Sequence, residues 1–186
     1  MAILKIARMG HPVLRVRAEE IDDPMAPEVQ RLVPHMLETM VDADGLGLAA
    51  PQIYVSKRLV IFSISADRAD EFGGEVVPMS VLINPMIEPL SDEMVTGWEG
   101  CLSVPGLRGQ VARHTHVGYR GLSLKGKPIE REAKGWHARV VQHEFDHLDG
   151  ILYPQRMDDL GELVFESEIK HLIEDPEERT AVEHAD

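Results

Sequence analysis

Residues 142–147 place two histidines four residues apart, with a glutamate directly after the first. On an α-helix this spacing puts His143 and His147 on one face, one turn apart, where they can hold one metal ion. Glu144 then lies within reach of a water on that metal. A metal lowers the pKa of its water from ~15.7 to about 7, so a neighbouring carboxylate can generate hydroxide at neutral pH. The motif predicts metal-dependent hydrolysis, against the alternative of a helix that merely exposes two histidines.

The single cysteine of the chain, Cys101, is the candidate for a third ligand. Gly100 before it and Pro105 after it suggest a sharply shaped loop that presents a side chain. Two histidines and one cysteine leave one tetrahedral position for water, as in a catalytic site, whereas a closed structural site needs a fourth protein ligand. His114 and His116 are the alternatives for that fourth ligand. A buried free cysteine without a metal is the ordinary alternative for Cys101 itself.

A third segment of interest, residues 45–52, contains two glycines, two alanines and Gln52. Its glycines let the backbone approach a ligand closely, and the Gln52 amide can donate a hydrogen bond to an oxygen. By itself such a loop is more often a helix C-cap and a turn.

Three helices are expected around these residues. Apolar residues recur at helical spacing over residues 27–43, where Pro34 should kink the helix or shift its start. A helix over about residues 135–148, with Gly150 as its stop, carries the two histidines. A final helix is expected over about residues 159–173.

Strands are expected over most of the first two thirds of the chain. Apolar and β-branched runs predict them over residues 59–64, 81–87, 110–124 and 126–132. This order of elements favours an α+β fold with antiparallel sheets over a doubly wound parallel fold.

Composition narrows the functional classes. A length of 186 residues suits one domain, and no apolar run is long enough for a transmembrane helix. The N-terminal residues lack the features of a signal peptide, and one cysteine cannot form an internal disulfide, so we expect a cytoplasmic protein. The net charge of −13 argues against general nucleic-acid binding. Residues 106–140 are rich in basic side chains. These side chains either form an ordinary solvated surface or attract the anionic parts of a peptide substrate.

Together, the segments G-x-G-L-A-A-x-Q, E-G-C-L-S and Q-H-E-x-D-H, in this order and spacing, resemble peptide deformylase. Residues 9–15 are similar to the N-terminal segment of that family, and the resemblance covers about residues 3–155. It implies removal of the formyl group from N-terminal formyl-methionine of newly made bacterial proteins. It also implies antiparallel β-sheets packed around a central metal-binding helix, with a C-terminal helix. We expect one domain over residues 1–186, in which about 174–186 form a frayed acidic tail.

The resemblance assigns the catalytic roles. The cysteine and the two histidines named above would hold the metal. Glu144 would take a proton from the attacking water and return it to the departing amine. The oxyanion would be stabilised by the metal, the Gln52 amide and the backbone N–H of Leu102. Asp146 would support the site, with Arg113 as its ion-pair partner.

The substrate-binding residues implied by the resemblance fall into two groups. Gly47, Gly100 and Arg108 would lie along the peptide-binding cleft. The methionine side chain would enter an apolar pocket near Leu46, Trp136 and Val140.

The identity of the metal is where ligand chemistry and resemblance differ. One cysteine, two histidines and a water favour zinc. The resemblance implies Fe²⁺, with Zn²⁺, Ni²⁺ or Co²⁺ able to occupy the site. We give the resemblance precedence because metal supply and geometry, rather than affinity alone, decide occupancy.

The expected partners are formyl-methionyl nascent polypeptides and, transiently, the ribosome, with no direct DNA or membrane binding. Two other functions remain as alternatives. An H-E-x-x-H metalloprotease would cleave internal peptide bonds, but such enzymes usually take their third ligand after the motif. A non-catalytic metal-binding module has no reason to combine Glu144, Gln52 and an open coordination position.

Overall fold

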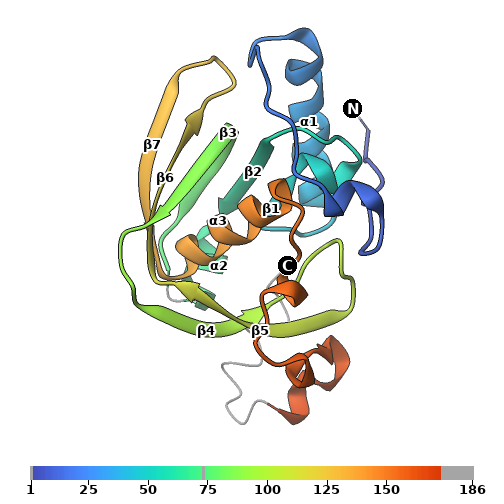
Figure 1. The fold of residues 1–186 in the computed structure, drawn as a ribbon, viewed down its shortest axis with the longest axis vertical. Coiled ribbons are helices and arrows are strands. Elements are labelled where there is room, and N and C mark those ends of the chain that lie inside the picture. The colour runs from blue at the N-terminus through green and yellow to red at the C-terminus, as the bar shows by residue number, and fades with distance from the viewer. Residues whose placement is uncertain (1, 73, 173–186) are drawn as a thin grey trace.

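Two antiparallel sheets enclose a central helix in the computed structural model, which describes residues 2–72 and 74–172 (Figure 1). The larger sheet has the strand order β1-β2-β3-β6-β7 and the smaller one the order β4-β5-β8. The larger sheet comprises β1 (Gly47–Ala49), β2 (Leu59–Ile64), β3 (Val77–Pro89), β6 (His116–Leu122) and β7 (Pro128–Lys134). The smaller sheet comprises β4 (Met94–Glu99), β5 (Leu107–His114) and β8 (Val164–Phe165). The predicted α+β class with antiparallel sheets is therefore confirmed.

The strand predictions differ in how well their limits agree with the structure. β2 has the predicted limits, while β3 is longer than residues 81–87. The single strand predicted over residues 110–124 is two strands, because the chain leaves the smaller sheet at Thr115 and enters the larger one. β5 pairs with β4, whereas β6 lies between β3 and β7. The break allows one continuous segment to contribute to both sheets.

The helix α3 (Gly135–Leu148) has the predicted limits and lies between the sheets (Figure 1). Its apolar residues Ala138, Val141, Phe145 and Leu148 pack into the main hydrophobic core with Phe62 and Tyr119. Gly150 ends the helix as expected: its φ is 74°, and the next N–H, that of Ile151, bonds to the carbonyl of Asp146 at 2.9 Å. The histidine-bearing helix is thus fixed along its length by the core and at its end by a left-handed turn.

The first helix, α1 (Pro27–Asp42), begins at a proline and continues through Pro34, so its start is not shifted. Its buried face closes a second core cluster, which contains Val29, Val33, Met36, Met40 and the buried residues of β2 that point away from α3. Val41, one of the apolar residues in the predicted helix over residues 27–43, is 70% exposed. A short helix, α2 (Ala66–Phe72), follows β2, and five 3₁₀ helices complete the described chain: Pro12–Arg15, Ala50–Ile53, Tyr153–Gln155, Leu160–Glu162 and Glu166–His171.

The C-terminal helix is present but shorter than expected. The segment predicted as one helix over residues 159–173 is divided into the 3₁₀ helix Leu160–Glu162, strand β8 and the 3₁₀ helix Glu166–His171. The pairing of β8 with Leu107 and Arg108 of β5 interrupts the helical course. Residues 173–186, including the expected acidic tail, lie outside the described residues. In the part of the chain that the structure describes, no helix is long and apolar enough to cross a membrane.

Candidate metal centre

The three predicted ligands meet at one point. Cys101 follows the end of β4, and His143 and His147 come from successive turns of α3. One nitrogen or sulfur atom from each lies within 4.8 Å of the others, and Cys101 Sγ is 3.3 Å from His147 Nε2. A cysteine and two histidines so close together offer the soft and borderline donors that suit a first-row divalent ion.

The alternative of a fourth protein ligand is not supported by the positions of the other histidines. His114 Nδ1 lies 3.0 Å from the carbonyl of Ser91, and His116 pairs with Glu132 at 2.8 Å. Among the described residues, the cluster of potential ligands contains only the cysteine and the two histidines of the motif. The arrangement is that of an open, catalytic site.

Glu99 orients the first histidine, a role that the sequence analysis missed. Its carboxylate accepts a hydrogen bond from His143 Nδ1 at 2.8 Å, which leaves Nε2 for a metal. Arg113 donates to both oxygens of Glu99, at 2.8 and 2.9 Å. Burial by itself would raise the pKa of Glu99, but Arg113 and His143 outweigh it and hold that pKa well below its ordinary value. Glu99 is therefore an anion that fixes the histidine ring.

Arg113 and Asp146 form the predicted ion pair, at 2.6 Å, and both side chains are nearly buried. Arg156 completes the arrangement from the far side, donating to both oxygens of Asp146 at 2.7 and 3.1 Å. Because Arg113 also holds Glu99, the ion pairs link α3 to β4 and β5 behind the metal ligands. Such a chain of charged hydrogen bonds fixes the distance between Cys101 and the histidines.

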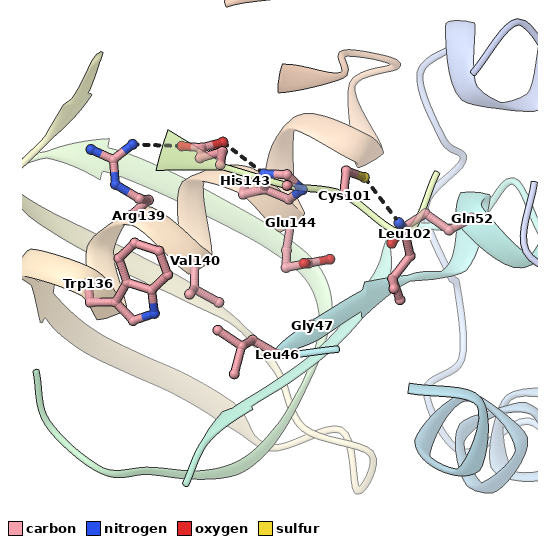
Figure 2. A pocket seen from close by; sticks show the side chains of 12 residues that line it. Leu46, Gly47, Gln52, Cys101, Leu102, Trp136, Arg139, Val140, His143 and Glu144 are labelled. Atoms are coloured by element: carbon pink, nitrogen blue, oxygen red, sulfur yellow. Dashed lines mark hydrogen bonds and ion pairs between the residues drawn. The ribbon is translucent and has the colours of Figure 1, made fainter. Parts of the chain in front are cut away.

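A cavity opens beside the ligands (Figure 2). Its volume, including the open mouth, is about 430 Å³. Ten predicted site residues line it: Leu46, Gly47, Gln52, Gly100, Cys101, Leu102, Trp136, Val140, His143 and Glu144. Glu99 and Arg139 complete the wall. His147 is not among the lining residues, but its Nε2 contacts Cys101 Sγ at 3.3 Å.

Arg108 is the predicted site residue that the structure places elsewhere. It is 1% exposed, does not line the cavity, and pairs with Glu166 at 2.6 Å. Arg108 lies in β5, beside β8, so its ion pair with Glu166 links the smaller sheet to the C-terminal segment. The expected role of Arg108 along the peptide-binding cleft stays a prediction.

Glu144 reaches into the cavity from α3 (Figure 2). The pKa of this carboxyl is raised to about 7. Burial is the largest cause, the neighbouring His143 opposes the rise, and Glu99 adds to it. Its Oε2 is buried and has no hydrogen-bond partner among the described residues. A carboxyl group with a pKa near neutrality and a free oxygen is suited to accept and return a proton.

The glutamine loop approaches the ligands from β1. Gln52 Oε1 accepts a hydrogen bond from the backbone N–H of Ala49 at 2.8 Å, which directs the amide nitrogen towards the metal centre. That nitrogen lies 3.6 Å from Cys101 Sγ and 3.3 Å from Ser103 Oγ. Ser103, which the sequence analysis also missed, donates its backbone N–H to Cys101 Sγ at 3.4 Å. Two N–H donors thus point at the Cys101 sulfur.

Arg139 forms one wall of the cavity, and nothing in the spacing of residues had suggested it. Its guanidinium donates to Glu99 at 2.9 Å and to the carbonyls of Val95 and Val111 at 2.7 and 2.8 Å. Gly97 leaves the room for this: a Cβ there would lie 3.0 Å from Arg139 Nη2. Arg139 therefore ties α3 to the two main strands of the smaller sheet.

Comparisons with known proteins agree on one family. A family model described as Polypeptide deformylase matches residues 3–162. Peptide deformylase 1 of Bordetella pertussis is 54% identical over 156 residues, covering 83% of this chain and 88% of that protein. The Met-Ala-Ser-bound crystal structure of class I type b peptide deformylase from Acinetobacter baumannii matches with a TM-score of 0.78 and 38% identity, over 84% of this chain and 99% of that one. The enzyme from Thermotoga maritima matches with a TM-score of 0.76 and 32% identity, over 86% and 100%.

Proposed function

This chain belongs to the polypeptide deformylase family, and we propose how its own residues hydrolyse the formyl group of an N-terminal formyl-methionine. The chain is a peptide deformylase by family: a metal-binding hydrolase of protein biosynthesis that releases formate. The observation that carries the assignment of roles is that Cys101, His143 and Glu144 line one cavity, with His147 in contact with Cys101. The alternative of a protease that cleaves internal peptide bonds has no support from these comparisons.

We assign the metal to Cys101 Sγ and one ring nitrogen of each histidine. The Glu99 bond to His143 Nδ1 directs Nε2 of that ring to the ion. When bound, the metal acts as a Lewis acid and lowers the pKa of a water to about 7. We propose Fe²⁺ as the natural ion, on the family resemblance, with Zn²⁺, Ni²⁺ or Co²⁺ as substitutes. The sulfur ligand suits any of these ions.

Glu144 is the proposed proton carrier. Its free oxygen accepts a proton from the attacking water, and the same group then donates it to the departing amine nitrogen. The oxyanion that forms on the formyl group needs donors already in place. The Gln52 amide, held by Ala49, and the backbone N–H of Leu102 are the proposed donors, since both residues line the cavity.

The proposed methionine pocket is the apolar end of the cavity, between Leu46, Val140 and Trp136. A Met-Ala-Ser peptide is bound in the related Acinetobacter baumannii enzyme, which supports a peptide with N-terminal methionine as the occupant here. Gly47 and Gly100 carry no side chain, so the peptide backbone can pass close to theirs. We propose that the substrates are formyl-methionyl nascent chains. The enzyme would bind them in the cytoplasm, during transient contact with the ribosome. We also propose that the chain acts as one domain.

Formate release from a formyl-methionyl tripeptide tests the proposed function. We expect turnover that stops when a chelator removes the metal and returns when Fe²⁺ is added under anaerobic conditions. An N-acetyl tripeptide and an internally cleavable peptide serve as controls and should remain intact. Cleavage of the internal peptide, or formate release that survives complete removal of the metal, would contradict the proposal.

A further inference from the structure

The hydroxyl of Ser103 is a buried polar group beside the metal centre that the proposed mechanism does not use. Ser103 has an exposed fraction of 0% and follows Cys101 by two residues. Its hydroxyl oxygen lies 3.3 Å from Gln52 Nε2, at hydrogen-bond distance. Ser103 is not among the residues that line the cavity, so its hydroxyl does not contact the substrate. An effect of this hydroxyl on the reaction therefore passes through Gln52.

The amide of Gln52 is held at both of its ends. Its Oε1 accepts the backbone N–H of Ala49 at 2.8 Å, so the nitrogen is the end that faces Ser103. A side-chain amide has two N–H donors on one nitrogen, and they point in different directions. When one N–H points at the Ser103 hydroxyl, the other is left for Cys101 Sγ, which is 3.6 Å from the nitrogen (Figure 2). The second N–H thus faces the metal ligands, where the oxyanion would form.

The N-terminal segment fixes the backbones on both sides of this contact. The N–H of Ala7 donates to the carbonyl of Gln52, and the N–H of Met9 donates to the carbonyl of Ser103, each at 2.7 Å. One short stretch of chain therefore bonds both the 3₁₀ helix that carries Gln52 and the loop that carries Ser103. Ala7 is itself buried. The hydroxyl and the amide are thus held in a fixed relation by their own backbones.

We propose that Ser103 is a positioning residue, whose hydroxyl accepts one N–H of the Gln52 amide and so directs the other towards the oxyanion. The inference rests on the proposed function, because it takes the Gln52 amide as a donor to that oxyanion. A donor that already points at the developing charge needs no reorganisation during the reaction, which is why such donors are effective. Without the hydroxyl, the amide loses the acceptor that holds it in this orientation.

The first test is a double-mutant cycle measured by formate release. Ser103→Ala removes the hydroxyl and leaves the rest of the side chain. We expect kcat to fall by about three- to tenfold, the range that corresponds to one neutral hydrogen bond, with KM unchanged. In the Gln52→Leu enzyme the same substitution should change kcat by less than about twofold, because the amide that Ser103 positions is absent. Metal content should stay at one ion per chain in all four proteins.

The second test does not depend on turnover. The side-chain amide of Gln52 is identified in a proton–nitrogen correlation spectrum of the Zn²⁺-loaded protein by its disappearance in Gln52→Leu. Ser103→Ala should shift this signal, because one of its two protons loses its acceptor. Ser123→Ala is the matched control, since that hydroxyl accepts the backbone N–H of Lys127 outside the cavity. It should leave both the Gln52 signal and kcat unchanged.

The outcomes separate this inference from the proposed function. An equal loss of kcat from Ser103→Ala in both backgrounds overturns the inference, because the hydroxyl would then act independently of Gln52. An unchanged kcat, a loss confined to KM, a loss of metal or an unmoved Gln52 signal overturns it as well. If Gln52→Leu itself keeps the wild-type kcat, the oxyanion role of Gln52 in the proposed function fails, and this inference with it.

Discussion

Replacing Gly47 by alanine should disable catalysis while leaving the metal bound. An ideal Cβ at Gly47 would overlap the carboxyl group of Glu144 and lie 2.7 Å from its Cγ. Carbon atoms in contact prefer about 3.5–4.0 Å, so Cγ must retreat by about 1 Å. Rotating the carboxyl group alone does not relieve this, because Cγ itself is too close. The Glu144 side chain must change its χ1 angle and leave the attacking water.

The expected loss follows from that displacement. A misplacement of 1 Å in a catalytic group can cost ~10² in rate, so kcat/KM of Gly47→Ala should fall by about that factor. The three atoms nearest to the new methyl group all belong to Glu144, so metal content should stay at one ion per chain. Formate release, measured beside elemental analysis, gives both values.

Gly118→Ala is the matched control for this change. The same methyl group there meets Leu90 at 3.4 Å, an ordinary contact on β6, outside the residues that line the cavity. Activity and metal content should both be unchanged. A fully active Gly47→Ala enzyme would refute the positioning of Glu144 described above, and a loss of metal from it would show that the glycine serves the ligands instead.

Three further predictions concern the surroundings of the site. Glu99→Gln should weaken metal binding by ~10–100-fold, measured by competition with a chelator, because His143 loses its anionic partner. Because the pKa of Glu99 is lowered in the folded protein, its negative charge stabilises the fold at pH values above the ordinary carboxyl pKa. This stabilisation is lost as the pH falls. The Tm of Glu99→Gln should therefore vary less than that of the wild type between about pH 5 and pH 2, and an unchanged slope would contradict the assignment. Gln52→Leu should lower kcat/KM by ~10² or more, and a loss confined to KM would make Gln52 a binding residue only. Deletion from residue 160 onward should lower the Tm by several degrees through loss of β8 and of the buried Ile169, whereas an unchanged Tm would show that this segment does not support the fold.

The metal ligands were predictable because their geometry is local. A spacing of four residues on a helix places His143 and His147 together whatever the rest of the fold does. Cys101 was identified by its being the only cysteine and by its loop. The limits of α3 also followed from local signals, since Gly150 ends the helix where expected.

Glu99 and Arg139 were missed because their roles depend on the pairing of strands. Glu99 and Arg113 meet across the β4–β5 pair, and Arg139 reaches them from α3. No spacing in the sequence indicates contacts between elements 14 and 40 residues apart. The same limit explains the final helix: a helical pattern of apolar residues gave way to β8, whose pairing with β5 is not visible in local sequence.

The substitution Glu144→Ala tests the central claim, which is that the three ligands hold the metal and the glutamate moves the proton. Metal content by elemental analysis and formate release from a formyl-methionyl tripeptide are measured on the same preparation. We predict one metal ion per chain with a loss of at least ~10²–10⁴ in kcat, since the carboxylate acts on water and not on the ion. Full metal content with wild-type turnover would contradict the account.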